Sequence, residues 1–340
     1  MSSILEYAED LASRRSKTRL RALRNVLLTG LAAVAGLLGQ PVRGSAEVPQ
    51  THYRHVEVDG LSIFYREAGS PNAPTILLLH GFPTSSHMFR GLIPLLADRY
   101  HLVAPDYPGF GYSSTPSAAT FNYTFDHLAD VIDHFTDVIG LKRYALYMQD
   151  YGGPVGLRLA TRHPDRVTAL LIQNANAYDE GITPELRRVV LRLETDHGEE
   201  ATASLRRLFE LPATKEGYLD GEPDPTLVDP DAWTHAQWGM ARPGNKDIQF
   251  ALQANYWSNI LLYPQWHAYF RRYQPPTLVT WGRGDLVFAV GGAAAYRNDL
   301  PKAEIHILSA GHFALESQSG PIADYIRDFL ARQGADQHSH

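Results

Sequence analysis

Short apolar runs alternate along the chain with segments whose apolar residues have helical spacing. Residues 75–79 (TILLL) are almost wholly apolar, as is typical of a strand buried on both faces. Similar strand-like runs cover residues 101–104, 144–148, 167–172, 277–281 and 304–308, and helical spacing covers residues 86–98, 123–139, 154–160, 292–299 and 321–332. Residues 51–68 instead alternate as two strands around an Asp59-Gly60 turn. This order predicts an α/β fold with a mostly parallel sheet and helices on both faces.

The pattern changes between residues 178 and 270, where strand signals are absent. Helical stretches occur at residues 184–193 and 201–211, and a loop-like stretch covers residues 214–231. We interpret residues 178–270 as a helical cap inserted into a core made of residues 47–177 and 271–333. The polar tail, residues 334–340, is expected to be disordered.

Residues 1–46 have the three parts of an export signal. A basic region between Arg14 and Arg24 precedes an apolar stretch at residues 26–39 and the small residues 44–46. The apolar stretch is shorter than the roughly 20 residues that a membrane-spanning helix needs. We therefore expect a periplasmic or secreted protein without a stable membrane span, and Ser13-Arg14-Arg15 suggests the twin-arginine route. The alternative is a cytoplasmic protein with a disordered extension or with a start codon assigned too far upstream.

Composition narrows the chemistry. The chain has 340 residues, a net charge of −6 and no cysteine. The negative charge gives no reason to expect nucleic acid as a partner. The absence of cysteine excludes disulfides, thiol catalysis and cysteine-ligated metal. The histidines show no HExxH-like spacing, so neither a metal nor another cofactor is expected.

The segment Gln149–Gly153 (QDYGG) lies between a strand-like run and a helix-like run. A sharp strand-to-helix turn of this kind lifts its middle side chain, Asp150, above the sheet. Aspartate has a reference pKa of about 3.9 and is an anion at neutral pH, whereas serine must first lose a proton. An aspartate nucleophile suits attack at saturated carbon, as in alkyl halides and epoxides.

Two further polar residues follow predicted strands. Asp285 comes after residues 277–281, and His312 comes after residues 304–308. Such residues gather at the carboxyl edge of an open α/β sheet, so we expect Asp285 to orient His312 and His312 to activate water for attack on the Asp150 ester. Taken singly, Asp150 could cap a helix, Asp285 could belong to a turn and His312 to a loop.

The segment His80–Pro83 (HGFP) ends the strand at residues 75–79. A tight loop there would aim the Phe82 N–H at the same point as the Tyr151 N–H, and two such donors form an oxyanion hole. We expect His80 to position this loop rather than to react.

These motifs resemble those of the α/β-hydrolase superfamily, in the branch of haloalkane dehalogenases and epoxide hydrolases. The resemblance covers residues 53–330 apart from the insertion, which is similar to that family's cap domain, and includes the segment Ala310–Phe313 (AGHF). It implies a covalent alkyl-enzyme ester. Gln149 is more typical of dehalogenases, and the HGFP motif is more typical of epoxide hydrolases. Some dehalogenases carry their acid after the sixth strand, but residues 173–176 (QNAN) contain no carboxylate, which leaves Asp285.

The resemblance also separates the two leaving groups. Dehalogenases usually hold the halide with a tryptophan after the nucleophile and a second tryptophan or an asparagine, but here Tyr151 and Phe82 occupy those places. Only a cap tryptophan could substitute: Trp233, Trp238, Trp257 or Trp266. Epoxide hydrolases protonate the opening oxygen with a cap tyrosine, and the candidates are Tyr178, Tyr218, Tyr256 and Tyr263.

Of the four tyrosines, Tyr256 is most similar to the family's proton donor, although each could simply pack in the cap. The sequence therefore predicts opening of small apolar epoxides to diols with water. Dehalogenation is the first alternative, and a catalytically silent binding protein is the second.

Overall fold

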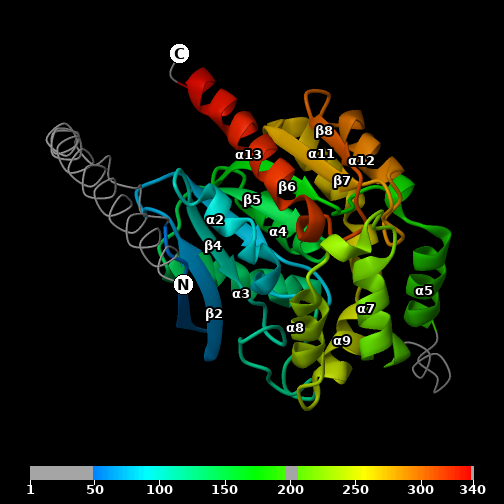
Figure 1. The fold of residues 1–340 in the computed structure, drawn as a ribbon. Helices are drawn as coiled ribbons and strands as arrows, with labels where there is room; N and C mark the ends of the chain where they lie inside the picture. The colour runs from blue at the N-terminus through cyan, green and yellow to red at the C-terminus, as the bar shows by residue number, and fades with distance from the viewer. Residues whose placement is uncertain (1–48, 196–205, 338–340) are drawn as a thin grey trace, which may run out of the picture. The chain divides into compact units, whose positions relative to one another are not determined.

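The computed structural model describes residues 49–195 and 206–337, so the predicted export segment lies outside the described residues. An eight-stranded sheet runs through the core in the order β1-β2-β4-β3-β5-β6-β7-β8 (Figure 1). Its strands are β1 (His52–Val58), β2 (Leu61–Ala68), β3 (Thr75–Leu79), β4 (His101–Pro105), β5 (Tyr144–Gln149), β6 (Val167–Gln173), β7 (Thr277–Gly282) and β8 (Glu304–Leu308). The β1–β2 and β2–β4 pairs are antiparallel and the others are parallel, which confirms the predicted mostly parallel sheet.

Helices cover both faces of this sheet. Helices α3 (Phe125–Val138), α4 (Gly152–Arg162), α11 (Tyr263–Tyr273) and α12 (Gly291–Ala295) contribute to one apolar cluster, and α2 (Ile93–Leu96) and α13 (Leu315–Gln337) contribute to the other. Helix α3 illustrates the reason, because its apolar residues, among them Leu128, Ile132 and Phe135, recur at helical spacing and are buried. Its aspartates lie on the other side. Asp126 and Asp130 pair with arginines of α4, and the last two pair with Arg166, which directly precedes β6.

Between β6 and β7 most of the described residues are helical. They form η2 (Asp179–Gly181), α5 (Pro184–Thr195), η3 (Arg207–Phe209), α7 (Leu211–Leu219), η4 (Pro225–Leu227), α8 (Pro230–Met240), α9 (Asn245–Ala254), α10 (Trp257–Leu261) and α11. In Figure 1, α5, α7, α8 and α9 lie together at one end of the sheet. The predicted helix at residues 201–211 falls partly outside the described residues.

Three predicted elements differ from the structure. Residues 86–98 form two short helices, η1 (Ser86–Arg90) and α2, because Pro94 cannot continue a helix that begins at residue 86. The predicted loop at 214–231 begins instead within α7, where buried Tyr218 stacks on Phe313 at 4.0 Å between ring centroids. The last helix continues to Gln337, although the polar composition predicts disorder from residue 334, because residues such as alanine and glutamine favour helix.

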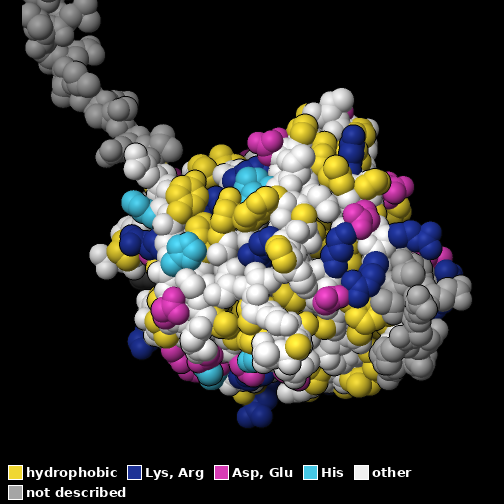
Figure 2. Space-filling view, turned by 90° about the horizontal axis from the view of Figure 1, so that it is seen from below, with side chains coloured by type: hydrophobic (Ala, Val, Ile, Leu, Met, Phe, Trp, Pro, Cys, Tyr) yellow, Lys and Arg dark blue, Asp and Glu magenta, His cyan; other side chains and the backbone are white. Residues whose placement is uncertain are grey.

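No helix of the described residues is long and apolar enough to cross a bilayer. On the face shown in Figure 2, acidic and basic side chains are interspersed, with hydrophobic side chains between them. That face therefore carries no broad field of one sign that would attract a polyanion.

Candidate active site

Asp150 lies at the bend between β5 and α4. Its φ of 48° places it in the left-handed region, which costs a non-glycine residue of order 1–3 kcal/mol. Glycines surround it because there is no room for a Cβ. A Cβ on Gly81 would lie 2.3 Å from Asp150 Cβ, and one on Gly152 would lie 2.2 Å from the Leu79 carbonyl oxygen. The bend is therefore held in a strained geometry by close packing on both sides.

The structure brings Asp150, Asp285 and His312 together. His312 Nδ1 is 2.9 Å from Asp285 Oδ2, and its Nε2 is 3.7 Å from Asp150 Oδ2. All three residues are at most 7% exposed. The imidazole thus lies between the two carboxylates, with one ring nitrogen directed at each.

Further donors hold the Asp285 carboxylate. Its Oδ1 accepts hydrogen bonds from the Val287 and Phe288 N–H groups at 2.7 and 2.9 Å. Its Oδ2 accepts from Asn174 Nδ2 at 2.7 Å, in addition to the contact with His312. This carboxylate is fixed at both oxygens and can orient the imidazole ring.

Two backbone donors converge on Asp150. The Phe82 N–H donates to Asp150 Oδ1 at 2.7 Å, and the Tyr151 N–H also hydrogen-bonds the carboxylate. The two groups predicted to form an oxyanion hole therefore meet at the nucleophile itself. The two oxygens of Asp150 differ, since Oδ1 accepts the Phe82 N–H and Oδ2 lies nearer His312.

Burial and charge oppose each other at this site. Burial raises the pKa of Asp150, against the opposing effect of His312 and the two N–H donors. This corrects the expectation of an ordinary aspartate pKa. Burial by itself would lower the pKa of His312, but Asp285 and Asp150 more than offset it, so the pKa lies above its ordinary value of 6.5. Both shifts predict loss of activity in acid, because the mechanism needs an ionised Asp150 and a neutral His312.

His80 lies below the oxyanion loop and is wholly buried. Its Nδ1 is 3.0 Å from the Gly81 carbonyl oxygen, and its Nε2 accepts a hydrogen bond from the Tyr107 N–H at 3.3 Å. Burial lowers the pKa of His80 to about 4. A neutral ring bonded on both sides supports the loop, in agreement with the structural role expected for it.

A mostly apolar cavity of about 310 Å³ contains Asp150 and His312 in its wall. Tyr256 lines it as well and is the one of the four candidate tyrosines that does so among the described residues. The hydroxyl of Tyr178 donates to Asp299, and the hydroxyl of Tyr263 accepts from Asn176. None of the four candidate tryptophans lines this cavity in the described part of the chain.

Sequence reasoning assigned no role to two residues that contact this site. Asn174 donates to Asp285, and Gln149 Nε2 lies 3.0 Å from His312 Nε2. Asn174 directly follows β6 and Gln149 directly precedes Asp150, and these positions were the only sign in the sequence that the two residues contact the site.

No three histidine, aspartate or glutamate side chains of the described residues are close enough to hold a metal ion.

Comparison with known proteins shows to which family the chain belongs. Residues 74–318 match the family model of the α/β-hydrolase fold. An uncharacterized hydrolase of Saccharomyces cerevisiae is 42% identical over 276 residues, which cover 80% of this chain and 94% of the relative. A haloalkane dehalogenase of Bradyrhizobium diazoefficiens is 37% identical over 171 residues, which cover 49% of this chain and 52% of the relative.

Solved structures support the same fold. A structure of DBJA has a TM-score of 0.70 at 24% identity, covering 84% of this chain and 99% of that one. The haloalkane dehalogenase DbeA of Bradyrhizobium elkani has a TM-score of 0.69 at 23% identity, covering 84% of this chain and 100% of that one. The family match confirms the resemblance to the α/β-hydrolase superfamily, and the partial match to a haloalkane dehalogenase supports the predicted branch. The chain is an enzyme that belongs to the α/β-hydrolase family.

Proposed function

We propose that this hydrolase opens small apolar epoxides to diols through a covalent ester on Asp150. The observation that carries the proposal is the cavity wall near Asp150. It contains Tyr256 but, among the described residues, neither a tryptophan nor an asparagine. A phenol can protonate an opening epoxide oxygen, whereas a departing halide needs hydrogen-bond donors but no proton.

In the first step, Asp150 Oδ2 attacks an epoxide carbon. Oδ1 already accepts the Phe82 N–H, which leaves Oδ2 as the nucleophilic atom. A C–O bond to Asp150 forms, the ring C–O bond breaks, and the alkoxide takes the hydroxyl proton of Tyr256. Burial raises the pKa of Tyr256 well above its ordinary value, so the phenol keeps its proton until the stronger alkoxide base forms.

In the second step, His312 removes a proton from water, and the hydroxide attacks the Asp150 carboxyl carbon. Negative charge then develops on Oδ1, where the Phe82 and Tyr151 N–H groups stabilise it. Collapse of this intermediate breaks the ester C–O bond, and the departing alkoxide takes the proton of the new carboxyl group, which releases the diol and leaves Asp150 ionised. The proton held by His312 returns to the Tyr256 phenolate through the product or water, and Asp150 keeps one oxygen atom from water.

Dehalogenation remains the second candidate, because the relative from Bradyrhizobium diazoefficiens bears that name and because the Gln253 amide also lines the cavity. It would use the same ester and the same hydrolysis step. A silent binding protein would instead form no ester. Epoxide opening, dehalogenation and a silent binding protein therefore differ in whether Asp150 is alkylated and in which electrophile alkylates it.

A His312→Gln variant tests them, since it removes the base for hydrolysis and traps the ester. We expect styrene oxide to add its mass to Asp150 in intact-mass and peptide analysis. Adding Tyr256→Phe should slow that alkylation by about 10²-fold or more, the usual contribution of a positioned proton donor. Tyr178→Phe is the matched control, because its hydroxyl binds Asp299 rather than lining the cavity.

The same variants treated with 1-bromobutane distinguish the alternatives. An adduct from the bromoalkane alone would overturn the proposal in favour of dehalogenation. No adduct from a broad panel of both electrophiles would favour the silent protein.

A further inference from the structure

Tyr256 lies between two asparagines that connect the cap to the core. On one side, Asn255 Oδ1 accepts a hydrogen bond at 2.9 Å from the Phe125 N–H, the first residue of α3. On the other side, Asn259 is buried in α10, and its N–H donates to the Tyr256 carbonyl at 3.0 Å. The segment that carries the proposed proton donor is thus fixed at both ends.

The partner of Asn259 is a buried cation on the nucleophile helix. Arg158 lies on α4 and is 3% exposed. Its Nη1 donates to Asn259 Oδ1 at 2.8 Å and to the Pro154 carbonyl at 3.1 Å, and its Nε donates to Asp126 Oδ1 at 2.5 Å. One guanidinium therefore joins α3, the helix that follows Asp150, and the cap helix that follows Tyr256.

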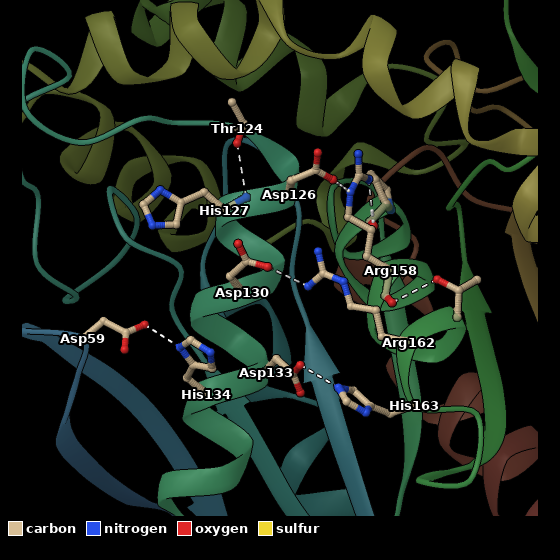
Figure 3. Close-up of polar contacts among 12 residues, drawn as sticks. Asp59, Thr124, Asp126, His127, Asp130, Asp133, His134, Arg158, Arg162 and His163 are labelled. Atoms are coloured by element: carbon tan, nitrogen blue, oxygen red, sulfur yellow. Dashed lines mark hydrogen bonds and ion pairs between the residues drawn. The ribbon is translucent and has the colours of Figure 1, made fainter.

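Arg158 belongs to a series of ion pairs between α3 and α4, shown in Figure 3. Further along, Arg162 of α4 pairs with Asp130 at 2.7 Å, and His163, the residue directly after α4, pairs with Asp133 at 2.7 Å. These two pairs connect α3 to the end of α4. Among the three, Arg158 alone also contacts the cap.

The burial of Arg158 is costly for a residue that only joins two helices. Its Nη2 and the Asn259 Nδ2 are buried without a hydrogen-bond partner among the described residues. The Asp126 side chain is 66% exposed, so it compensates the buried charge only in part. An apolar residue of similar volume often replaces a buried ion pair without loss of stability. These costs are the reason to look for a role of Arg158 beyond stability.

We propose that Arg158 is a positioning residue that acts through Asn259 to hold the Tyr256 hydroxyl over Asp150. The inference rests on the proposed function, because it assigns Arg158 a part in epoxide opening. Arginine suits this role, since its planar fork donates in fixed directions to several acceptors at once. Lysine could keep the pair with Asp126 but could not hold Asn259 and Asp126 in the same geometry.

The test measures the rate of Asp150 alkylation in the His312→Gln background. Arg158→Met, Arg158→Lys and Asn259→Leu should each slow alkylation by styrene oxide by about 10- to 100-fold, the effect of a misplacement of about 1 Å. Arg162→Met is the matched control and should leave this rate unchanged. Thermal unfolding of each variant separates misfolding from misplacement, and Asn259→Leu tests the contact while leaving the buried charge and its partner Asp126 intact.

A double-mutant cycle with Tyr256→Phe tests whether Arg158 and Asn259 act through the Tyr256 hydroxyl. Without the hydroxyl, Arg158→Met and Asn259→Leu should have almost no further effect on alkylation. Equal effects with and without the hydroxyl, or equal effects of Arg158→Met and Arg162→Met, would overturn the positioning role. If Tyr256→Phe alone leaves the rate unchanged, the proposed proton donor itself is wrong. The positioning role alone is refuted if Tyr256→Phe slows alkylation of Asp150 but folded Arg158 and Asn259 variants alkylate at the unchanged rate.

Discussion

Gln149 contacts the nitrogen of His312 that must accept a proton from water. Gln149 Nε2 lies 3.0 Å from His312 Nε2, and His312 Nδ1 lies 2.9 Å from Asp285 Oδ2. With the ring proton on Nδ1 and directed at Asp285, Nε2 is an acceptor, and the Gln149 amide donates to it. This hydrogen bond stabilises the neutral imidazole and disfavours its protonation.

The substitution Gln149→Met should therefore raise the pKa of His312. A neutral hydrogen bond contributes about 0.5–1.5 kcal/mol, and about 1.4 kcal/mol corresponds to one pKa unit, so the rise should be roughly 0.4–1.1 units. In the ester Asp150 is uncharged, but the Asp285 carboxylate still acts to raise this pKa. Because hydrolysis needs the neutral ring, the acidic limb of the ester-hydrolysis rate should move further to higher pH. Stability should not fall, because the Gln149 Oε1 is buried without a partner among the described residues.

Single-turnover hydrolysis of the ester, followed across pH, is the assay. Gln149→Glu should shift the limb further than Gln149→Met, because a carboxylate favours the imidazolium. Gln253→Met provides the control, since Gln253 lines the cavity and has no hydrogen bond to His312 within the described part of the chain. An unchanged limb for Gln149→Met would refute the reasoning, and a shift to lower pH would mean that the amide oxygen faces a protonated Nε2.

Three further predictions concern the reacting carboxylate and its surroundings. Gly81→Ala should slow alkylation by about 10²-fold, because the new Cβ would lie 2.5 Å from Asp150 Oδ1. Gly239→Ala is the control and should leave the rate unchanged, because there is open space around its Cβ. Equal rates for the two variants would contradict the packing argument. Asp285→Asn should lower the hydrolysis rate by about 10⁴-fold, and adding Asn174→Asp should restore part of it, because the two side chains are 2.7 Å apart; no recovery in a folded double variant would contradict this. In a single turnover in ¹⁸O-water, mass spectrometry should find the label in Asp150 and not in the diol, and label in the diol would mean that water attacks the substrate directly.

The fold could be predicted because its signals are local. Buried parallel strands require apolar runs, and all six such runs in the sequence are strands with ends within about one residue of the prediction. The turn at Asp59-Gly60 was evident for a similar reason. Both residues have positive φ, 52° and 77°, which Asp-Gly adopts readily in a hairpin.

The sequence was enough to predict which residues react, but not the side-chain contacts that hold them in position. Asp150, Asp285 and His312 follow strands whose ends must meet, so topology alone brings them close. The direction of a cap side chain depends on the rotation of its helix, where one residue is about 100°. For that reason the helical pattern alone could not separate Tyr256, which directly precedes α10, from Tyr263, which begins α11, and only the family resemblance favoured Tyr256.

The oxyanion hole has different consequences for the two steps. Before reaction, the Phe82 N–H already donates to the Asp150 carboxylate at 2.7 Å, so this donor stabilises charge that the first step removes. A donor accelerates a step only if it binds the transition state more strongly than the ground state. Alkylation neutralises Asp150, so the N–H groups oppose it, whereas hydrolysis rebuilds charge on Oδ1 and gains from them. Stabilisation of the first transition state must then come from the leaving-group side of the cavity, where Tyr256 supplies a phenol that burial keeps protonated.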